Sequence, residues 1–199
     1  MSTTTTPKPD IVAFLAHIAE QEKHFNELET EYRKLASTWL LAAMGGCGYV
    51  LTADKIPLDV TWLLVSAIGY MSSVGIFVLY VMDLNVYHKM AESYFVEGLY
   101  LELKHSDWIR PIRMRMLKAL RSNSVTKRVS FYYFTSIALL MGIGLTGLRQ
   151  SNAIKTPCFE ILESLTLIVL AVLLNAMFRY SKNEEAIELL GKYDLKKAK

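Results

Sequence analysis

The residues with the clearest chemical potential lie in a basic stretch near the middle of the chain. Seven Lys and Arg residues and no acidic residue occur between Trp108 and Arg128, and acidic residues stay absent as far as Phe159. Arginine side chains match the oxygens of phosphate, which predicts a site for a nucleotide, an oligonucleotide or another anionic ligand. In the alternative, the charges fix the topology and contact anionic lipid headgroups. The seven residues are Arg110, Arg113, Arg115, Lys118, Arg121, Lys127 and Arg128.

Other chemistry has little support in the residue pattern. His17 and His24 are seven residues apart on one helix face and are the candidates to join His88 at a metal ion, but no cysteine accompanies them. Cys47 and Cys158 have no metal spacing, and whether they pair is open. The sequence has no phosphate-binding loop, nucleophile elbow or zinc-protease motif. We therefore expect no enzyme, no cofactor and no metal.

Four long uncharged runs must position these residues. The chain is 52% hydrophobic yet 21% charged, and its charges are sorted into blocks rather than spread along every segment. Crossing a bilayer takes about 20 apolar residues, so these runs predict four transmembrane helices and an all-α polytopic membrane protein. The expected spans are residues 35–53, 60–82, 129–148 and 159–178, and the last has Glu160 and Glu163 at its outer boundary.

The distribution of Lys and Arg predicts the orientation of the spans. The segments before the first span, between the second and third, and after the fourth carry 19 Lys and Arg residues, against 3 in the two short loops. Basic residues concentrate on the cytoplasmic side. We expect two hairpins in the inner (plasma) membrane, with both termini in the cytoplasm.

Helical patterns continue beyond the first two spans on the cytoplasmic side. Apolar residues recur at a three-four spacing from Ile11 to Leu35, and this stripe needs a partner in water. The continuation of the second span, Asp83–Lys104, is the expected partner, and Pro111 then starts a new helix. The predicted organisation is a disordered segment 1–10, a long helical hairpin 11–104, a basic helix and linker 105–128, and a second hairpin with a C-terminal cytoplasmic helix, 129–199.

Small and aromatic residues inside the spans predict packing and a constriction. Small residues let helices approach closely in lipid, and an asparagine there bonds across helices. The expected packing residues are Gly45, Gly46, Gly48, Gly69, Gly75, Gly142, Gly144, Gly147 and Asn175. In an oligomer, aromatic rings form a gate that closes by dewetting. The candidate gate residues are Tyr49, Tyr70, Phe77 and Tyr80.

Two functions are compatible with these features. In one, copies of the chain assemble around an axis into a pore that a cytoplasmic signal opens at the basic helix. In the other, the chain is a non-conducting scaffold, immunity or accessory protein that binds a partner protein through its cytoplasmic helices. The small-residue faces and the helical extensions serve either role.

The layout resembles the small helical membrane effectors of bacterial conflict systems, which include SLATT-type proteins and effectors controlled by nucleotides or oligonucleotides. The shared features are architectural and cover roughly the first 105 residues: the lead-in Ile11–Lys34, the paired spans and the continuation Asp83–Lys104. SLATT proteins usually have two spans, whereas this chain carries a second pair. The resemblance implies a homo-oligomeric pore that disrupts membrane potential in anti-phage defence.

Overall fold

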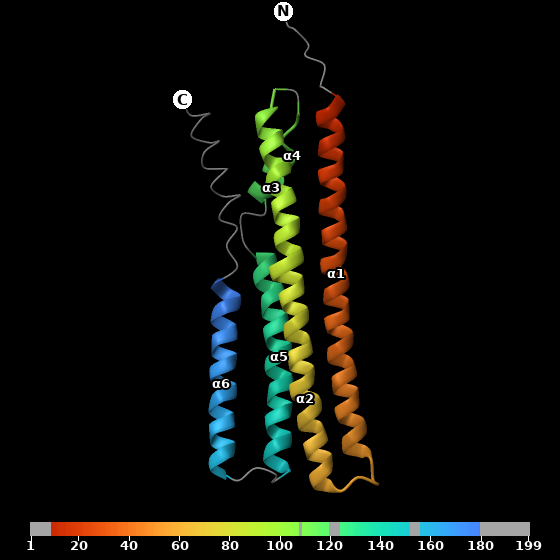
Figure 1. Ribbon diagram of the computed structural model, residues 1–199, viewed down its shortest axis with the longest axis vertical. Coiled ribbons are helices and arrows are strands. Elements are labelled where there is room, and N and C mark those ends of the chain that lie inside the picture. Colours follow the sequence, from red (N-terminus) through yellow and green to blue (C-terminus); the bar gives the residue numbers. More distant parts are fainter. Residues whose placement is uncertain (1–8, 108, 120–123, 152–155, 180–199) are drawn as a thin grey trace, which may run out of the picture. The chain divides into compact units, whose positions relative to one another are not determined.

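The chain folds into helices. The computed structural model describes residues 9–107, 109–119, 124–151 and 156–179, and these ranges contain no β-strand. The predicted all-α class is confirmed for them. The helices are α1 (Pro9–Thr52), α2 (Leu58–Tyr80), the π-helix η1 (Val81–Tyr87), α3 (His88–Lys104), α4 (Ile112–Ala119), α5 (Ser124–Gln150) and α6 (Thr156–Arg179) (Figure 1). Of the predicted disordered segment 1–10, residues 1–8 lie outside the described residues, and Pro9 and Asp10 belong to α1. The predicted C-terminal helix after Arg179 also lies outside the described residues.

Four helices are long and apolar enough to cross a membrane, as the uncharged runs predict. They are Asp10–Thr52, Leu58–Lys104, Lys127–Gln150 and Phe159–Ala176. Most of their apolar surface faces outward, and only 6% of the apolar window of α6 is buried. A soluble helix turns its apolar side inward, so outward apolar surface on every helix suits a lipid environment.

Two helices extend well beyond their apolar runs. α1 begins with Pro9 and Asp10, a proline and an acid that suit the first turn of a helix, and it stays helical to Thr52. The second helix continues from α2 through η1 into α3 without a break. The sequence predicts both extensions, but it does not predict the π-helix η1 between α2 and α3. Its wider turn shifts the face on which the following residues lie.

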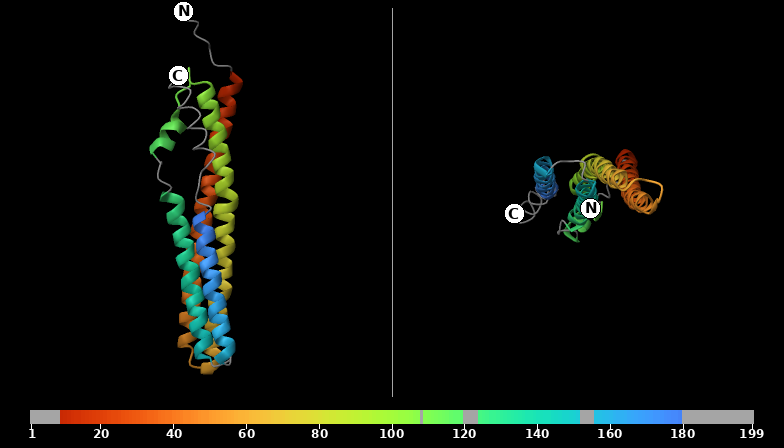
Figure 2. Two further views of the ribbon diagram at one scale, coloured as in Figure 1. Left: turned by 90° about the vertical axis from the view of Figure 1, so that its left-hand side faces the viewer. Right: turned by 90° about the horizontal axis from the view of Figure 1, so that it is seen from below.

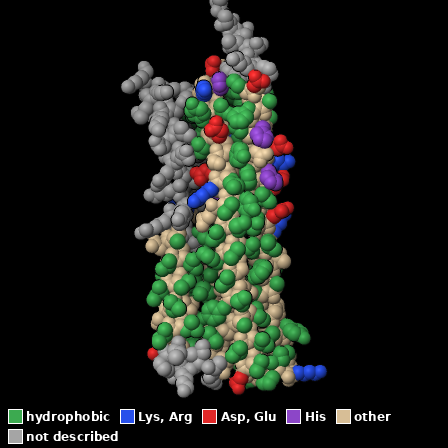
Figure 3. All heavy atoms as spheres, in the orientation of Figure 1, with side chains coloured by type: hydrophobic (Ala, Val, Ile, Leu, Met, Phe, Trp, Pro, Cys, Tyr) green, Lys and Arg blue, Asp and Glu red, His purple; other side chains and the backbone are tan. Residues whose placement is uncertain are grey.

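The described chain divides into two compact units, and each long helix contributes to both. The first comprises 1–30, 84–123 and 182–199, and we call its described part the extension unit. The second comprises 31–83 and 124–181, and we call its described part the span unit. In Figure 3, Asp, Glu and His side chains gather over the extension unit, whereas hydrophobic side chains cover most of the span unit.

In the span unit, α2 contacts both α1 and α5, and α6 lies beside α5 (Figure 2). α1 and α2 run antiparallel, because Trp39 meets Gly75 near one end and Gly46 meets Ile68 nearer the connecting turn. The hydroxyl of Ser73 and those of other serines and threonines in these helices bond to carbonyls one turn earlier. Hydroxyl groups satisfied in this way can face lipid without an unpaired donor.

In the extension unit, the apolar stripe of α1 packs against α3, as predicted. Phe25 stacks on Tyr94 with ring centroids 5.7 Å apart, and Ile18 and Leu99 are fully buried. Glu29 adds a polar contact, because its carboxylate lies 3.1 Å from Nδ1 of His88. Burial of this stripe explains why both helices stay ordered where their sequence is no longer apolar throughout.

Candidate functional site

The best-defined polar cluster of the span unit surrounds Asp83 in η1. The side chain of Asp83 is 0% exposed although it carries a carboxylate. Arg33 of α1 donates from Nε to Oδ2 over 2.9 Å and from the second amino group to Oδ1 over 3.2 Å. Tyr133 of α5 donates its hydroxyl to Oδ2 over 3.0 Å. One carboxylate thus joins helices α1, η1 and α5.

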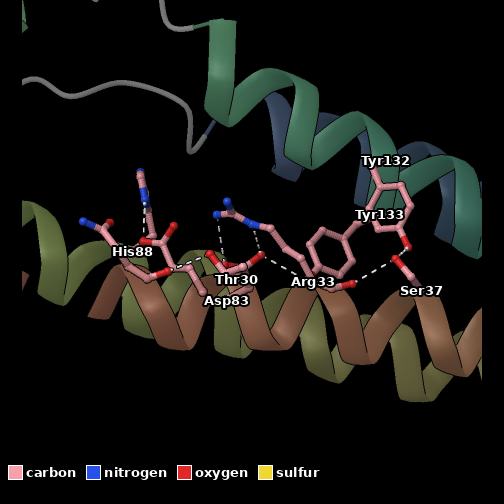
Figure 4. Close-up of polar contacts among 9 residues, drawn as sticks. Thr30, Arg33, Ser37, Asp83, His88, Tyr132 and Tyr133 are labelled. Atoms are coloured by element: carbon pink, nitrogen blue, oxygen red, sulfur yellow. Dashed lines mark hydrogen bonds and ion pairs between the residues drawn. The ribbon is translucent and has the colours of Figure 1, made fainter. Parts of the chain in front are cut away.

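Three tyrosines, Tyr80 of α2 and Tyr132 and Tyr133 of α5, lie beside this carboxylate. Tyr133 is fully buried and meets the edge of Tyr80 at a centroid distance of 5.7 Å. The neighbouring Tyr132 lies 2.9 Å from the hydroxyl of Ser37 on α1. Figure 4 shows Arg33, Asp83 and Tyr133 converging, with Ser37 one turn along α1 and Tyr132 facing it from α5. We refer to Arg33, Ser37, Asp83, Tyr132 and Tyr133 as the Asp83 cluster.

The electrostatics of the Asp83 cluster favour an intact pair and penalise a broken one. A two-bond contact between arginine and a carboxylate is strong and directional. A buried charge that loses its partner costs about 3–5 kcal/mol, because water cannot replace the lost contact. The cluster therefore holds three helices in one arrangement while its bonds are made. That property suits a switch more than a site of bond-breaking chemistry.

The sequence analysis does not predict this cluster, because it treats Asp83 only as the start of the extension Asp83–Lys104 and assigns no role to Arg33. A signal was nevertheless present. Arg33 precedes the first uncharged run, Asp83 follows the second, and only a short turn joins the two runs. Two antiparallel helices of similar length bring these ends together, so opposite charges at the two ends predict a contact.

The four candidate gate residues do not gather on one surface of the span unit. Tyr49 is 74% exposed on α1, whereas Tyr80 is buried beside Tyr133. Phe77 stacks on Tyr80 at 6.2 Å. Tyr70 packs its ring against Gly144 of α5, and its buried hydroxyl has no hydrogen-bond partner among the described residues. Tyr80 thus borders the Asp83 cluster, Phe77 packs behind Tyr80, and of the four only Tyr49 is exposed.

The expected packing residues fall into two groups. At Gly69, Gly75, Gly144 and Gly147 an added Cβ would lie within 3 Å of a neighbouring helix, so these glycines are where helices touch. Gly46 makes an ordinary contact with Ile68. Asn175 is exposed on α6. The remaining three, for which a Cβ would meet nothing within 4 Å, are Gly45, Gly48 and Gly142.

The basic residues are also divided by the structure. Arg113 is buried and bonded to two carboxylates, so its guanidinium is already occupied and does not face an incoming anion. Arg113 thereby differs from the exposed members of the predicted ligand site. Arg110, Arg115, Lys127 and Arg128 are exposed. Arg121 and the side chain of Lys118 lie outside the described residues.

The metal-ligand candidates are likewise separated. His17 and His24 are exposed on α1, and His88 pairs with Glu29. Among the described residues, no three His, Cys, Asp or Glu side chains are placed to hold a metal ion. Cys47 is a buried free thiol, and the side chain of Cys158 is not described. Comparison with known protein families, curated proteins and solved structures finds no match to the chain.

The hydroxyl of Tyr133 provides a graded test of the Asp83 cluster. Tyr133→Phe removes one hydrogen bond to a charged acceptor, so we expect a loss of about 1.5–3 kcal/mol of stability. Tyr132→Phe is the matched control, because it removes a neutral hydroxyl contact and should cost only about 0.5–1.5 kcal/mol. Thermal unfolding of the purified protein in detergent measures both. Equal melting temperatures for the two variants would contradict the assignment of Tyr133 as an Asp83 donor.

Proposed function

We propose that the chain is a four-pass protein of the inner membrane that assembles into a pore and changes ion permeability when its cytoplasmic helices receive a signal. In this arrangement the spans form two hairpins, and both termini are cytoplasmic. The preponderance of Lys and Arg outside the two short loops supports the orientation. The resemblance to small membrane effectors of bacterial conflict systems suggests a role in anti-phage defence.

The observation that carries this proposal is the buried charge of Asp83 within a π-helix. π-helices frequently mark functional sites, because the wider turn strains the helix. A buried ion pair is a poor source of net stability but a good device for selecting one arrangement over another. Asp83 directly follows the second uncharged run and belongs to the continuous helix Leu58–Lys104. A passive anchor needs neither feature.

Surfaces left open on the span unit support self-association. Only 6% of the apolar window of α6 is buried, and α1 presents the exposed Tyr49 together with Gly45 and Gly48, where a Cβ would meet nothing within 4 Å. Thin helix faces allow copies to approach closely in lipid. For the signal, the exposed Arg110 and Arg115 are the cations of α4 and its entry that remain available to a nucleotide, an oligonucleotide or an anionic lipid.

A voltage-sensitive dye in cells that express the chain tests the pore. We expect the wild-type chain to depolarise the cells when the activating condition is met. The Asp83→Asn chain should lose the dependence on that condition, because the pair that selects one arrangement is gone. The amount of each chain in the membrane fraction is measured first, so that a failure of insertion is not counted as a failure of conduction.

The alternative is a non-conducting scaffold or immunity protein that binds a cytoplasmic protein through the extension unit. Its signature is a partner that copurifies at fixed stoichiometry, together with no conductance after reconstitution in planar bilayers. That pair of results would overturn the pore and establish the scaffold. Conductance steps from the reconstituted wild-type chain would do the reverse.

A further inference from the structure

Arg113 at the start of α4 joins three helices of the extension unit. Its Nε and one terminal amino group donate to the two oxygens of Glu22 on α1, over 3.0 and 2.9 Å. The other amino group donates to Oε1 of Glu102 on α3 over 3.0 Å. The backbone N–H of Arg113 also donates to Oε2 of Glu102, over 2.9 Å. Glu102 thus holds both the side chain of Arg113 and the beginning of α4.

Gly98 on α3 makes room for this guanidinium. A Cβ at Gly98 would lie 2.5 Å from Cζ of Arg113 and 2.6 Å from Nε. The guanidinium therefore rests on the backbone of α3, and Arg113 is only 9% exposed. Met114 beside it is also buried. The position of Gly98 is about three turns beyond the start of α3, so α4 docks near the far end of that helix.

Few of the described side chains of α4 are buried. The helix has eight residues, too few to be stable alone. Its other large apolar side chains with described placement, Ile112 and Met116, are exposed, and so is Arg115. Among the side chains of α4 that the structure describes, Arg113 and Met114 are thus the two that are buried.

The positive charge of Arg113 keeps the carboxylates of Glu22 on α1 and Glu102 on α3 from repelling each other. Burial alone would lower the pKa of Arg113, but hydrogen bonds and charge from Glu22 and Glu102 outweigh it, so the pKa is raised and the guanidinium stays charged. Two carboxylates share this one cation. If Arg113 leaves, Glu22 and Glu102 face each other across α1 and α3, and the attraction becomes a repulsion between like charges.

We infer that Arg113 acts as a latch between helices. When α4 is docked, Arg113 holds α1 against α3, and when α4 undocks, α1 and α3 separate. The contacts Glu22–Arg113–Glu102 define the closed state, and the unneutralised carboxylate pair drives the open one. A ligand that binds α4 only when it is undocked would shift this equilibrium by its differential affinity. The latch itself stands on the geometry of the extension unit, and only its effect on permeability rests on the proposed function.

Hydrogen–deuterium exchange of the full chain in nanodiscs tests the latch. Gly98→Ala keeps every charge and improves helix propensity, yet its methyl group collides with the guanidinium. We expect exchange in residues 9–30 and 88–104 to rise about tenfold or more, because bonds between charged groups are lost. Gly142→Ala, whose Cβ meets nothing within 4 Å, is the matched control and should leave exchange unchanged.

A second pair of variants separates the latch from general damage. Arg113→Ala should raise exchange in the same segments, and adding Glu22→Gln should reverse part of the rise, because one of the two repelling carboxylates is gone. Unchanged exchange in Arg113→Ala, or no recovery in the double variant, would overturn the latch. If Gly98→Ala unfolds α5 as well, the exchange of Arg113→Ala with and without Glu22→Gln decides whether the latch exists. Faster exchange without any change in membrane potential would leave the latch standing and count against the pore.

Discussion

Replacing Asp83 by asparagine is expected to destabilise the chain by about 3 kcal/mol, which lowers the melting temperature by ~6–12 °C. The substitution keeps the shape of the side chain but removes the charge that Arg33 and Tyr133 bind. The effect lies at the lower end of the range for broken buried pairs, because the side chain of Arg33 is 30% exposed and part of its charge can turn to water. Thermal unfolding in detergent gives the shift.

Replacing Arg33, Asp83 and Tyr133 together tests whether the Asp83 cluster stabilises the protein or selects one arrangement of its helices. The triple variant Arg33→Met, Asp83→Leu, Tyr133→Phe removes the ion pair together with the hydroxyl that donates to it, so much of the lost stability should return. The signal-dependent depolarisation of cells should not return in this variant, because no ion pair then favours one arrangement of η1. A wild-type melting temperature for Asp83→Asn would show that the ion pair does not form in the protein.

The fold was accessible from the sequence where one physical effect dominated. Uncharged runs of about 20 residues have few alternatives to a membrane helix, and the structure has four helices that qualify. The three-four stripe from Ile11 to Leu35 likewise identified α3 as its partner, because apolar surface in water must be covered. Phe25 stacked on Tyr94 is the realised contact.

The site was less accessible, because it depends on which charges meet rather than on how many there are. Arg113 stands among six other basic residues in the sequence, and no local pattern separates it from Arg115. Only the fold brings Glu22, which is 91 positions away in the chain, and Glu102, which is 11 positions away, to the same guanidinium. The π-helix was inaccessible for a related reason. The sequence of Val81–Tyr87 has no proline or glycine and no local pattern that predicts a wider turn.

The contact between α2 and α5 was predicted only as a property of small residues, and the structure identifies its tightest point. A Cβ at Gly69 would lie 2.7 Å from both the amide nitrogen of Gly144 and the carbonyl oxygen of Leu140. Both neighbours are backbone atoms of α5, so no side chain can turn aside to make room. The two helices would have to separate.

Gly69→Ala should therefore destabilise the span unit by about 1–3 kcal/mol or more through overpacking, a drop of ~2–12 °C in melting temperature. Gly142→Ala makes the same chemical change on α5 where a Cβ meets nothing within 4 Å, and it should be neutral or slightly stabilising, because alanine favours the helix. The contrast matters more than either value. Helix propensity alone predicts that both variants gain stability, so only a close approach of two backbones makes them differ in sign. Two equally stable variants would mean that α2 and α5 do not meet at Gly69.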